Sequence, residues 1–378
     1  MIKKIVCVLF CFILLSTVVY ADEKTTTIDV INMGTKENII VYTLSLDDAI
    51  KMALTNNPQL NASIVKKEDT KIQLKAARET KADYRDLKNI PITTAYELVY
   101  IKNGYYVHTY ENMLKLADYE YKQLEAQIAY KVTEKYYNLK NCERLLEISQ
   151  SSYDLVLTNY NNASLSYELG VVSKSELDSA YVSLLQAKFS LQVTKDNYTI
   201  AEEDFKISLN KNNEICKFVL TDTLDITEFS TNLEQDLIVA ENSRYDITSL
   251  KANYDLAKEY LDLTLGAAVT RKSSAKSSFI TAEYNYTNNK ALILLGIKSS
   301  YNNITASRNN VTLASETLKL KKNAYNIATI QYEHGLITNI ELLTAMNNMY
   351  VAEVEFENAK LKYRLSVDKY KYDVEIGI

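Results

Sequence analysis

The sequence has 378 residues, of which 7 are Gly and 2 are Pro, and 47% are apolar. Gly and Pro punctuate turns, so this scarcity excludes a chain of many short elements, such as a β-sandwich or an open α/β sheet, and favours a mainly α fold built from a few very long helices. The formal net charge of −5 gives no basis for nucleic-acid binding.

Residues 1–21 have the pattern of a secretory signal peptide. Two lysines precede an apolar run that ends at Val19, and Val19-Tyr20-Ala21 resembles a cleavage site. We therefore expect export and removal of this segment, with a short membrane anchor as the alternative, and an N-terminal extension over 22–41. The sequence after residue 21 has no run of about 18 apolar residues, so we predict no further helix that spans a bilayer.

Residues 37–46 and 217–227 are extended in character and predict small strands or irregular belts midway along the body. Ser45-x-x-Asp48 looks like the start of a helix, because a serine hydroxyl at that position caps free backbone N–H groups.

Two segments recur along the chain, which predicts an internal duplication. Residues 167–180, YELGVVSKSELDSA, match residues 332–345, YEHGLITNIELLTA, at an offset of 165. Residues 46–60 match residues 233–247 at an offset of 187. We therefore expect two repeats: residues 42–215 and residues 216–378.

The offsets differ by 22 residues, so the first repeat should carry an insertion. We place it at residues 86–108, where Asn103-Gly104 between β-branched and aromatic runs predicts a short β-hairpin. The corresponding stretch of the second repeat, residues 266–296, has the composition of a loop with at most weak strand character.

Long helices are expected between these landmarks. A helix from about Tyr110 to Tyr167 would run for roughly 85 Å and must bury an apolar stripe along its length. Large and small residues recur at alternating spacings of three and four from Leu177 to Ser208, and again from Leu342 to Tyr370. This heptad spacing predicts two seams of left-handed helix packing.

Each seam begins with a capping box, Ser173-x-x-Glu176 in the first repeat and Thr338-x-x-Glu341 in the second. A glycine three residues before each box, Gly170 or Gly335, suits the left-handed residue that ends a helix. The predicted fold is thus a tandem duplication of long antiparallel helical hairpins, a coiled-coil protomer with at most a short β-hairpin and minor strands. The expected hairpin tips lie near residues 169–175 and residues 334–340.

No motif for catalysis or cofactor binding is present. His108 and His334 are the only histidines, and neither has a partner at the spacing of metal ligands. Gly-rich phosphate loops and nucleophile motifs are missing from the sequence. Cys142 and Cys216 remain after the signal peptide and could pair or stay free. We expect no enzyme activity, no cofactor and no metal.

The opening LSLDDAIKMALTNNPQL, the two tip motifs and the tandem halves resemble the TolC-type outer membrane efflux protein family over about residues 42–378. The resemblance implies that three chains join their hairpins into one hollow α-barrel and add strands to a shared membrane β-barrel. It also implies that the tips meet a periplasmic adaptor coupled to an inner-membrane pump. The expected function is a trimeric efflux and transport conduit of the cell envelope.

The resemblance carries over to five residues. Gly170 and Gly335 match tip glycines that contact the adaptor, Glu176 and Glu341 match acidic residues of the closed pore end, and Tyr332 matches a tyrosine of the gate network. Plain helix capping is the other interpretation of the two glutamates. Two further family positions depart from the pattern: Ile337 replaces a basic gate residue, and Thr344 replaces an acidic pore residue.

The membrane strands are the larger departure from the family. A membrane strand needs about 9–11 residues, yet the first half offers one short hairpin and the second almost nothing. We expect a member with reduced or missing barrel strands, which leaves membrane association open. Its location is the outer membrane by resemblance, or otherwise an extracytoplasmic or cell-wall site. The alternative function is a secreted or wall-associated coiled-coil scaffold without transport.

Overall fold

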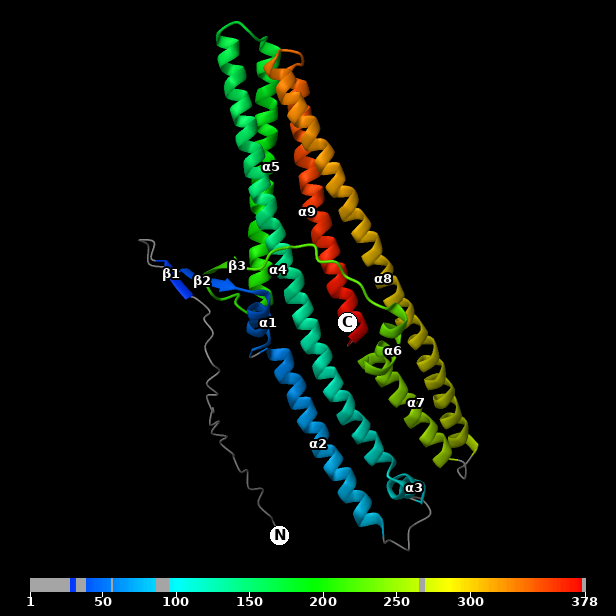
Figure 1. Ribbon diagram of the computed structural model, residues 1–378. Coiled ribbons are helices and arrows are strands. Elements are labelled where there is room, and N and C mark those ends of the chain that lie inside the picture. Colours follow the sequence, from blue (N-terminus) through cyan, green and yellow to red (C-terminus); the bar gives the residue numbers. More distant parts are fainter. Residues whose placement is uncertain (1–27, 32–38, 56, 86–94, 265–268, 376–378) are drawn as a thin grey trace.

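The computed structural model describes residues 28–31, 39–55, 57–85, 95–264 and 269–375. Figure 1 shows an elongated body of antiparallel helices, with a small sheet beside its middle. The signal peptide expected at residues 1–21 lies outside the described residues. None of the described helices is both long enough and apolar enough to cross a bilayer.

Two long helical hairpins dominate the body. In the first, α4 (Tyr105–Glu168) packs antiparallel to α5 (Lys174–Ser208), and in the second, α8 (Val269–Glu333) packs antiparallel to α9 (Asn339–Glu375). The predicted mainly α fold with duplicated hairpins is confirmed. Each residue of the two predicted seams is buried or half-buried, so the alternation of large and small side chains does pack the helices together.

A shorter helix pair precedes each hairpin. In the first repeat it is α1 (Leu46–Leu54) and α2 (Pro58–Arg85), and in the second α6 (Leu233–Ser243) and α7 (Tyr245–Leu263). The side chain of Ser45 accepts a hydrogen bond from the Asp48 backbone N–H, which confirms the predicted helix start. α2 and α7 run toward the end of the body opposite the tips, where α2 packs on α4 and α7 on α8 (Figure 1).

The β-hairpin predicted near residues 86–108 is wrong over the described part, 95–108. This part is α3 (Ala95–Asn103), followed by Gly104 and the start of α4, while residues 86–94 lie outside the described part. Gly104 has the left-handed φ of 79°, so the Asn-Gly pair supplies a left-handed turn between two helices instead of two strands. Tyr100 stacks on Tyr260 of α7 with ring centroids 5.3 Å apart, and this tertiary contact favours the helix.

The loop predicted at residues 266–296 is also wrong from residue 269 onward, where α8 already runs. Residues 265–268 lie outside the described part. The fully buried Ala275 within this stretch, and Ile297 directly after it, anchor it against its neighbours. Such burial outweighs the weak helix propensity of its many Ser, Thr and Asn residues.

The small sheet has the strand order β1-β2-β3. β1 (Ile28–Ile31) pairs antiparallel to β2 (Ile39–Leu44), and β2 pairs in parallel with β3 (Cys216–Leu220), with Ile40 opposite Cys216. The extended stretches predicted at 37–46 and 217–227 are therefore strands over 39–44 and 217–220. Leu44 and Phe218 join the core around Tyr136 and Phe205.

An extended segment, residues 221–232, joins the two repeats, and we call it the strap. Figure 1 shows it crossing α4 and α9 on its way from β3 to α6. Two buried tyrosines hold its backbone: Tyr136 of α4 accepts a hydrogen bond from the Asp222 N–H at 3.0 Å, and Tyr363 of α9 donates to the Thr227 carbonyl at 3.0 Å. Glu228 of the strap also pairs with Arg308 of α8.

Candidate functional site

The two hairpin tips share one backbone geometry. Gly170 and Gly335 have φ angles of 73° and 68°, and each donates its N–H to a carbonyl three residues earlier at 2.9 Å. The next N–H reaches back five residues at 2.8 Å in both tips, which is the pattern that closes a helix around a left-handed glycine. A Cβ added at either glycine would meet no atom within 4 Å, so both tips are open to a partner.

Large apolar side chains project from both tips. Leu169 and Val171 are 70% and 75% exposed, and Leu336 of the second tip is 73% exposed. The tips lie together at one end of the body (Figure 1). Contiguous exposed apolar side chains at the end of a rigid element are typical of an interaction site.

The two predicted capping boxes are both present. The Ser173 N–H donates to Glu176 at 3.1 Å and the Glu176 N–H to the Ser173 hydroxyl at 3.3 Å. At the second tip the Thr338 N–H donates to Glu341 at 2.8 Å. Hydrogen bonds from the Thr338 backbone and side chain lower the pKa of Glu341. Both carboxylates thus cap helices, whatever further role they have.

Tyr332 lies close to the opposite tip. Burial raises the pKa of its phenol, and the carboxylate of Glu176 raises that pKa further. The structure therefore brings Tyr332 of the second hairpin into electrostatic range of Glu176 of the first. The glycines and Glu341 lie at the same end without a described side-chain contact to this pair.

A reciprocal amide pair, not anticipated from the sequence, joins the hairpins just below the tips. Asn159 of α4 donates to Asn339 of α9 at 2.7 Å, and Asn339 donates back at 3.1 Å. Asn339 is buried. The two residues are 180 positions apart in the sequence, so the local sequence pattern could not predict their contact.

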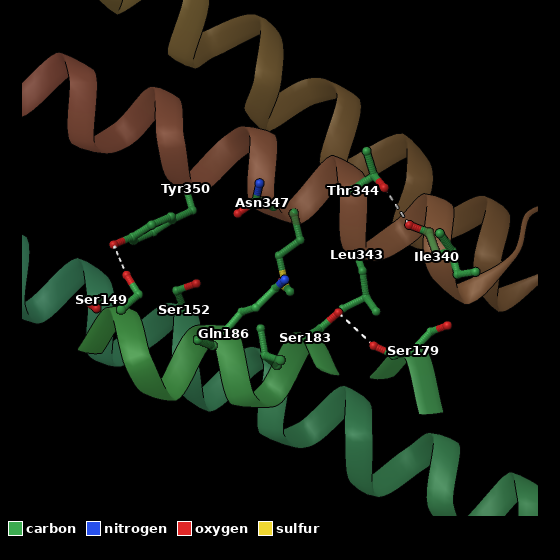
Figure 2. Close-up of a pocket in the computed structure, with 14 residues that line it drawn as sticks. Ser149, Ser152, Ser179, Ser183, Gln186, Ile340, Leu343, Thr344, Asn347 and Tyr350 are labelled. Atoms are coloured by element: carbon green, nitrogen blue, oxygen red, sulfur yellow. Dashed lines mark hydrogen bonds between the residues drawn. The ribbon is translucent and has the colours of Figure 1, made fainter. Parts of the chain in front are cut away.

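A groove runs between α5 and α9 over α4, and we call it the inner groove. It consists of two hollows of about 460 and 470 Å³ that both border Tyr350. Figure 2 shows the hollow nearer the tips, with polar side chains converging from all three helices. Nine of its 14 lining residues carry a hydroxyl or amide group, and the recurrence of serine at 179, 183 and 190 is the sequence signal that could have revealed it.

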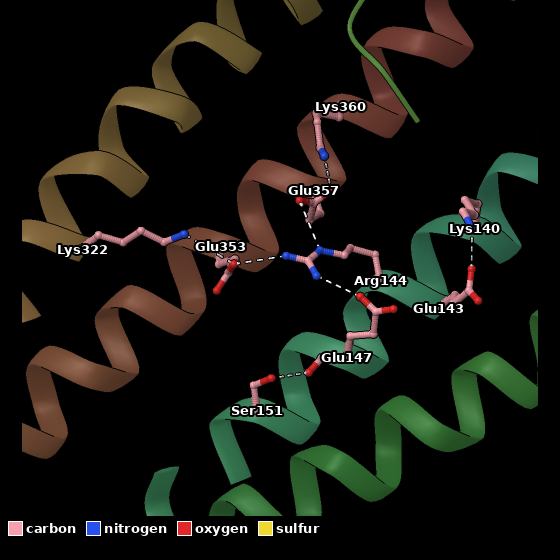
Figure 3. Close-up of polar contacts among 9 residues, drawn as sticks. All are labelled: Lys140, Glu143, Arg144, Glu147, Ser151, Lys322, Glu353, Glu357 and Lys360. Carbon is pink, nitrogen blue, oxygen red and sulfur yellow. Dashed lines mark hydrogen bonds and ion pairs between the residues drawn. The ribbon is translucent and has the colours of Figure 1, made fainter. Parts of the chain in front are cut away.

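A charged network lies farther from the tips (Figure 3). Arg144 of α4 pairs with Glu147 of its own helix at 2.8 Å, and with Glu353 and Glu357 of α9 at 3.6 and 3.8 Å. Lys322 of α8 also pairs with Glu353. The network therefore connects the two hairpins. The nearby carboxylates, Glu147 first, raise the pKa of Arg144.

The strap and the inner groove lie on opposite faces of the helical layer. On α4, Tyr136 binds the strap, whereas Asn138 and Asn141 line the groove. Successive helical residues are about 100° apart, so residues two positions apart point to nearly opposite sides. The same holds on α9, where Tyr363 binds the strap and Leu361 lines the groove.

The described residues contain no group of three or more His, Cys, Asp and Glu side chains able to hold a metal ion. Cys142 and Cys216 are both free. Burial raises the pKa of each thiol, so neither has the lowered pKa of a nucleophilic cysteine.

Comparisons with known proteins agree with this geometry. Residues 261–368 match the family model of the outer membrane efflux protein. No curated protein sequence matches the chain. Solved structures with a similar fold include the outer membrane channels CmeC of Campylobacter jejuni and MtrE of Neisseria gonorrhoeae and the outer membrane protein VceC of Vibrio cholerae.

The similarity to these channels extends over most of the chain. CmeC is 16% identical, with a TM-score of 0.70 over 87% of this chain and 85% of CmeC. VceC and MtrE are both 12% identical, each over 88% of this chain and over 97% and 89% of their own, with TM-scores of 0.68 and 0.66. The resemblance to the efflux protein family is confirmed, and the fold is that of these channels.

Proposed function

We propose that this chain is the protomer of an efflux conduit of the cell envelope, in which three copies close into a ring around a passage, with no catalysis of its own. The observation that carries the proposal is a pair of apolar edges, one on each side of the helical layer. The number three rests on the resemblance to the family.

The order of the helices defines the two edges. In the half with the tips, α4 packs on α5 and α9, and α9 packs on α8. In the other half, α4 packs on α2 and α7, and α7 packs on α8. α8 therefore forms one edge along the whole body, while α5 and α2 together form the other.

Both edges expose apolar stripes that face away from their own protomer. On α8, Leu313 and Leu320 are exposed, although Val311 and Leu318 two positions earlier are buried. The α5 edge has its own stripe of exposed residues: Val182, Leu185, Phe189, Val193, Ile200 and Ile207. Two different apolar surfaces on one chain favour a head-to-tail interface, which closes into a ring when the rotation between copies allows it.

The strap indicates which face lines the passage. A connecting chain on the inner face would obstruct the passage, so the strap belongs outside and the inner groove faces inward. Thr344, which occupies a pore position by family resemblance, lines this groove. At the open end of the tips, Gly170 and Gly335 would contact a periplasmic adaptor coupled to an inner-membrane pump, while Glu176, Tyr332 and Glu341 would form the gate.

The test is the oligomeric state of the exported chain. Light scattering should give three copies, and electron microscopy should show a hollow particle. Leu320→Asp on α8 should release monomers, and so should Phe189→Asp on α5. Ile238→Asp, an equally apolar exposed site on α6, is the matched control and should leave the ring intact. A monomeric wild-type protein without hollow particles would overturn the proposal.

A further inference from the structure

We infer that the inner groove is a binding site for organic cations that carry hydrogen-bond donors, such as primary ammonium compounds. The binding itself depends only on one protomer. Its interpretation as contact with cargo rests on the proposed conduit function.

Three hydroxyl groups of the groove offer acceptors instead of donors. Ser179, Ser183 and Thr344 donate their hydroxyl protons to backbone carbonyls four residues earlier, at 2.8, 3.0 and 2.8 Å. A hydroxyl that has committed its single proton keeps only lone pairs for a ligand. Figure 2 shows these side chains on two of the helices that surround the hollow.

Asn141 adds a buried acceptor with no protein partner. Its side chain is 3% exposed, and its Nδ2 donates to Asn358 at 3.0 Å. Its Oδ1 has no hydrogen-bond partner in the structure, although the residue lines the second hollow. A buried carbonyl without a hydrogen bond is unfavourable, so a donor from a bound molecule that reached this oxygen, after a shift of the side chains that cover it, would restore the missing bond.

The charge of the lining favours cations. The described residues that line the two hollows include no Lys, Arg or His, and Asp204 is the one charged group among them. Its carboxylate pairs at 3.1 Å with Lys135, which lies outside the lining. Hydroxyl oxygen acceptors with no cationic side chain in the lining favour an ammonium group over an anion.

Tyr350 supplies an aromatic surface where the two hollows meet. It reaches from α9 toward α5 (Figure 2), and its hydroxyl lies 3.3 Å from the Ser190 hydroxyl. An aromatic face binds the flat or alkylated part of an organic cation. The volume of each hollow is within the range of small-molecule sites, about 300–1,000 Å³.

The composition of the protein makes the test direct. The chain has no tryptophan, so the fluorescence of an indole ligand can be followed when it is excited at a wavelength beyond the absorption of the 30 tyrosines. Three probes share the indole group and differ in the end group: tryptamine is a cation with N–H donors, tryptophol is a neutral donor, and indole-3-acetate is an anion. Fluorescence anisotropy should rank their affinities in that order, with tryptamine at least about tenfold tighter than indole-3-acetate.

Variants locate the binding. Ser183→Ala removes one acceptor and Asn141→Leu removes the unpaired carbonyl, and each should weaken tryptamine binding about threefold to tenfold. Ser151→Ala is the matched control, because Ser151 of α4 makes the same bond to a carbonyl four residues earlier but does not line the groove. If Asn141→Leu fails to fold, Ser183→Ala still tests the site.

Three outcomes would overturn the inference: no binding of tryptamine, equal affinity for the cation and the anion, or an equal loss in Ser151→Ala. Light scattering on the same samples reports ring formation separately. Binding by a monomer would thus support the cation site and contradict the conduit. An intact ring without binding would support the conduit and contradict the cation site.

Discussion

The contacts within each hairpin differ in composition from the contacts between the two hairpins. Within the first hairpin, α5 buries Ala180, Leu191 and Phe205 along its seam. Between the hairpins, α4 and α9 share a small apolar cluster of Val156, Leu343 and Met346, and they also meet through the amide pair of Asn159 and Asn339 and through the charged network around Arg144. We call the polar part of this second contact the polar joint.

The difference indicates where the protomer can change shape. Separating an apolar seam exposes surface at a cost of about 25 cal/mol per Å², so each hairpin should move as one body. Polar groups at the joint can exchange protein partners for water at a net cost of about 1 kcal/mol per hydrogen bond. Motion between open and closed tips should therefore occur at the polar joint. Variants in the apolar seam and variants in the polar joint test this difference.

The largest effect is expected from the apolar seam. Phe205→Ala deletes a fully buried ring and should reduce the free energy of unfolding by about 3–5 kcal/mol. Phe189→Ala on the same helix, where the ring is 73% exposed, should change a monomer's stability by about 0.5 kcal/mol or less. Urea denaturation followed by circular dichroism measures both, and similar losses would contradict the assignment of the seam.

A smaller effect is expected at the joint near the tips. Asn339→Leu removes both hydrogen bonds of the amide pair and leaves Asn159 without its partner, so the free energy of unfolding should fall by about 1–3 kcal/mol. The distance between spin labels at Glu168 and Glu333, the last residues of α4 and α8, should become longer and more variable. Cys142 and Cys216 are replaced by Ser for this labelling.

Arg144→Met should weaken the joint farther from the tips. Arg144 is half-exposed, so its pairs contribute only about 1 kcal/mol, and added salt should reduce the difference from the wild type. The same spin labels should report wider tips at low salt. Arg78→Met removes an exposed pair between α2 and α4 and is the matched control; equal widening in that variant would show that the joint has no special role.

The last effect is absent near neutral pH and appears only at alkaline pH. Tyr130 packs edge-on against Tyr372 across the joint, and burial raises the pKa of Tyr130 to about 12. A raised pKa means that the neutral phenol stabilises the fold below the ordinary value near 10, and that this stability is lost as pH rises from about 10 to about 12. Tyr130→Phe should resist this loss while matching the wild type near neutral pH, as thermal melts across the pH range will show.

The parts of the fold that were predictable depend on local sequence. The tip glycines, the capping boxes and the seams are each specified within a few residues or by one helical period, and all three are present in the structure. The pair Asn103-Gly104 misled because a left-handed residue suits a turn between helices as well as one between strands. The buried ring of Tyr100 against Tyr260 decided between them, and that contact is not local.

The joint was not predictable for the same reason, and recurring serines were the one sequence signal of the inner groove. Asn141 and Asn358 are 217 positions apart, and a lone Asn on a helix carries no mark of its partner. The groove depends on how far α5 and α9 diverge over α4, which heptad spacing alone does not specify. The sequence of a single chain therefore predicts the helix-packing seams more readily than the contacts and grooves that those packed helices form with one another.

The strap makes the middle of the body a pivot. It ties α4 and α9 at one level through Tyr136 and Tyr363, so the hairpins are held at that level, and nearer the tips the amide pair of Asn159 and Asn339 joins them. α5 has 35 residues and acts as a lever of roughly 50 Å from this level to its tip. A tilt of about 5° at the pivot would displace the tip by about 4–5 Å, roughly the width of a side chain. Small rotations beside the strap would thus be magnified at the tips.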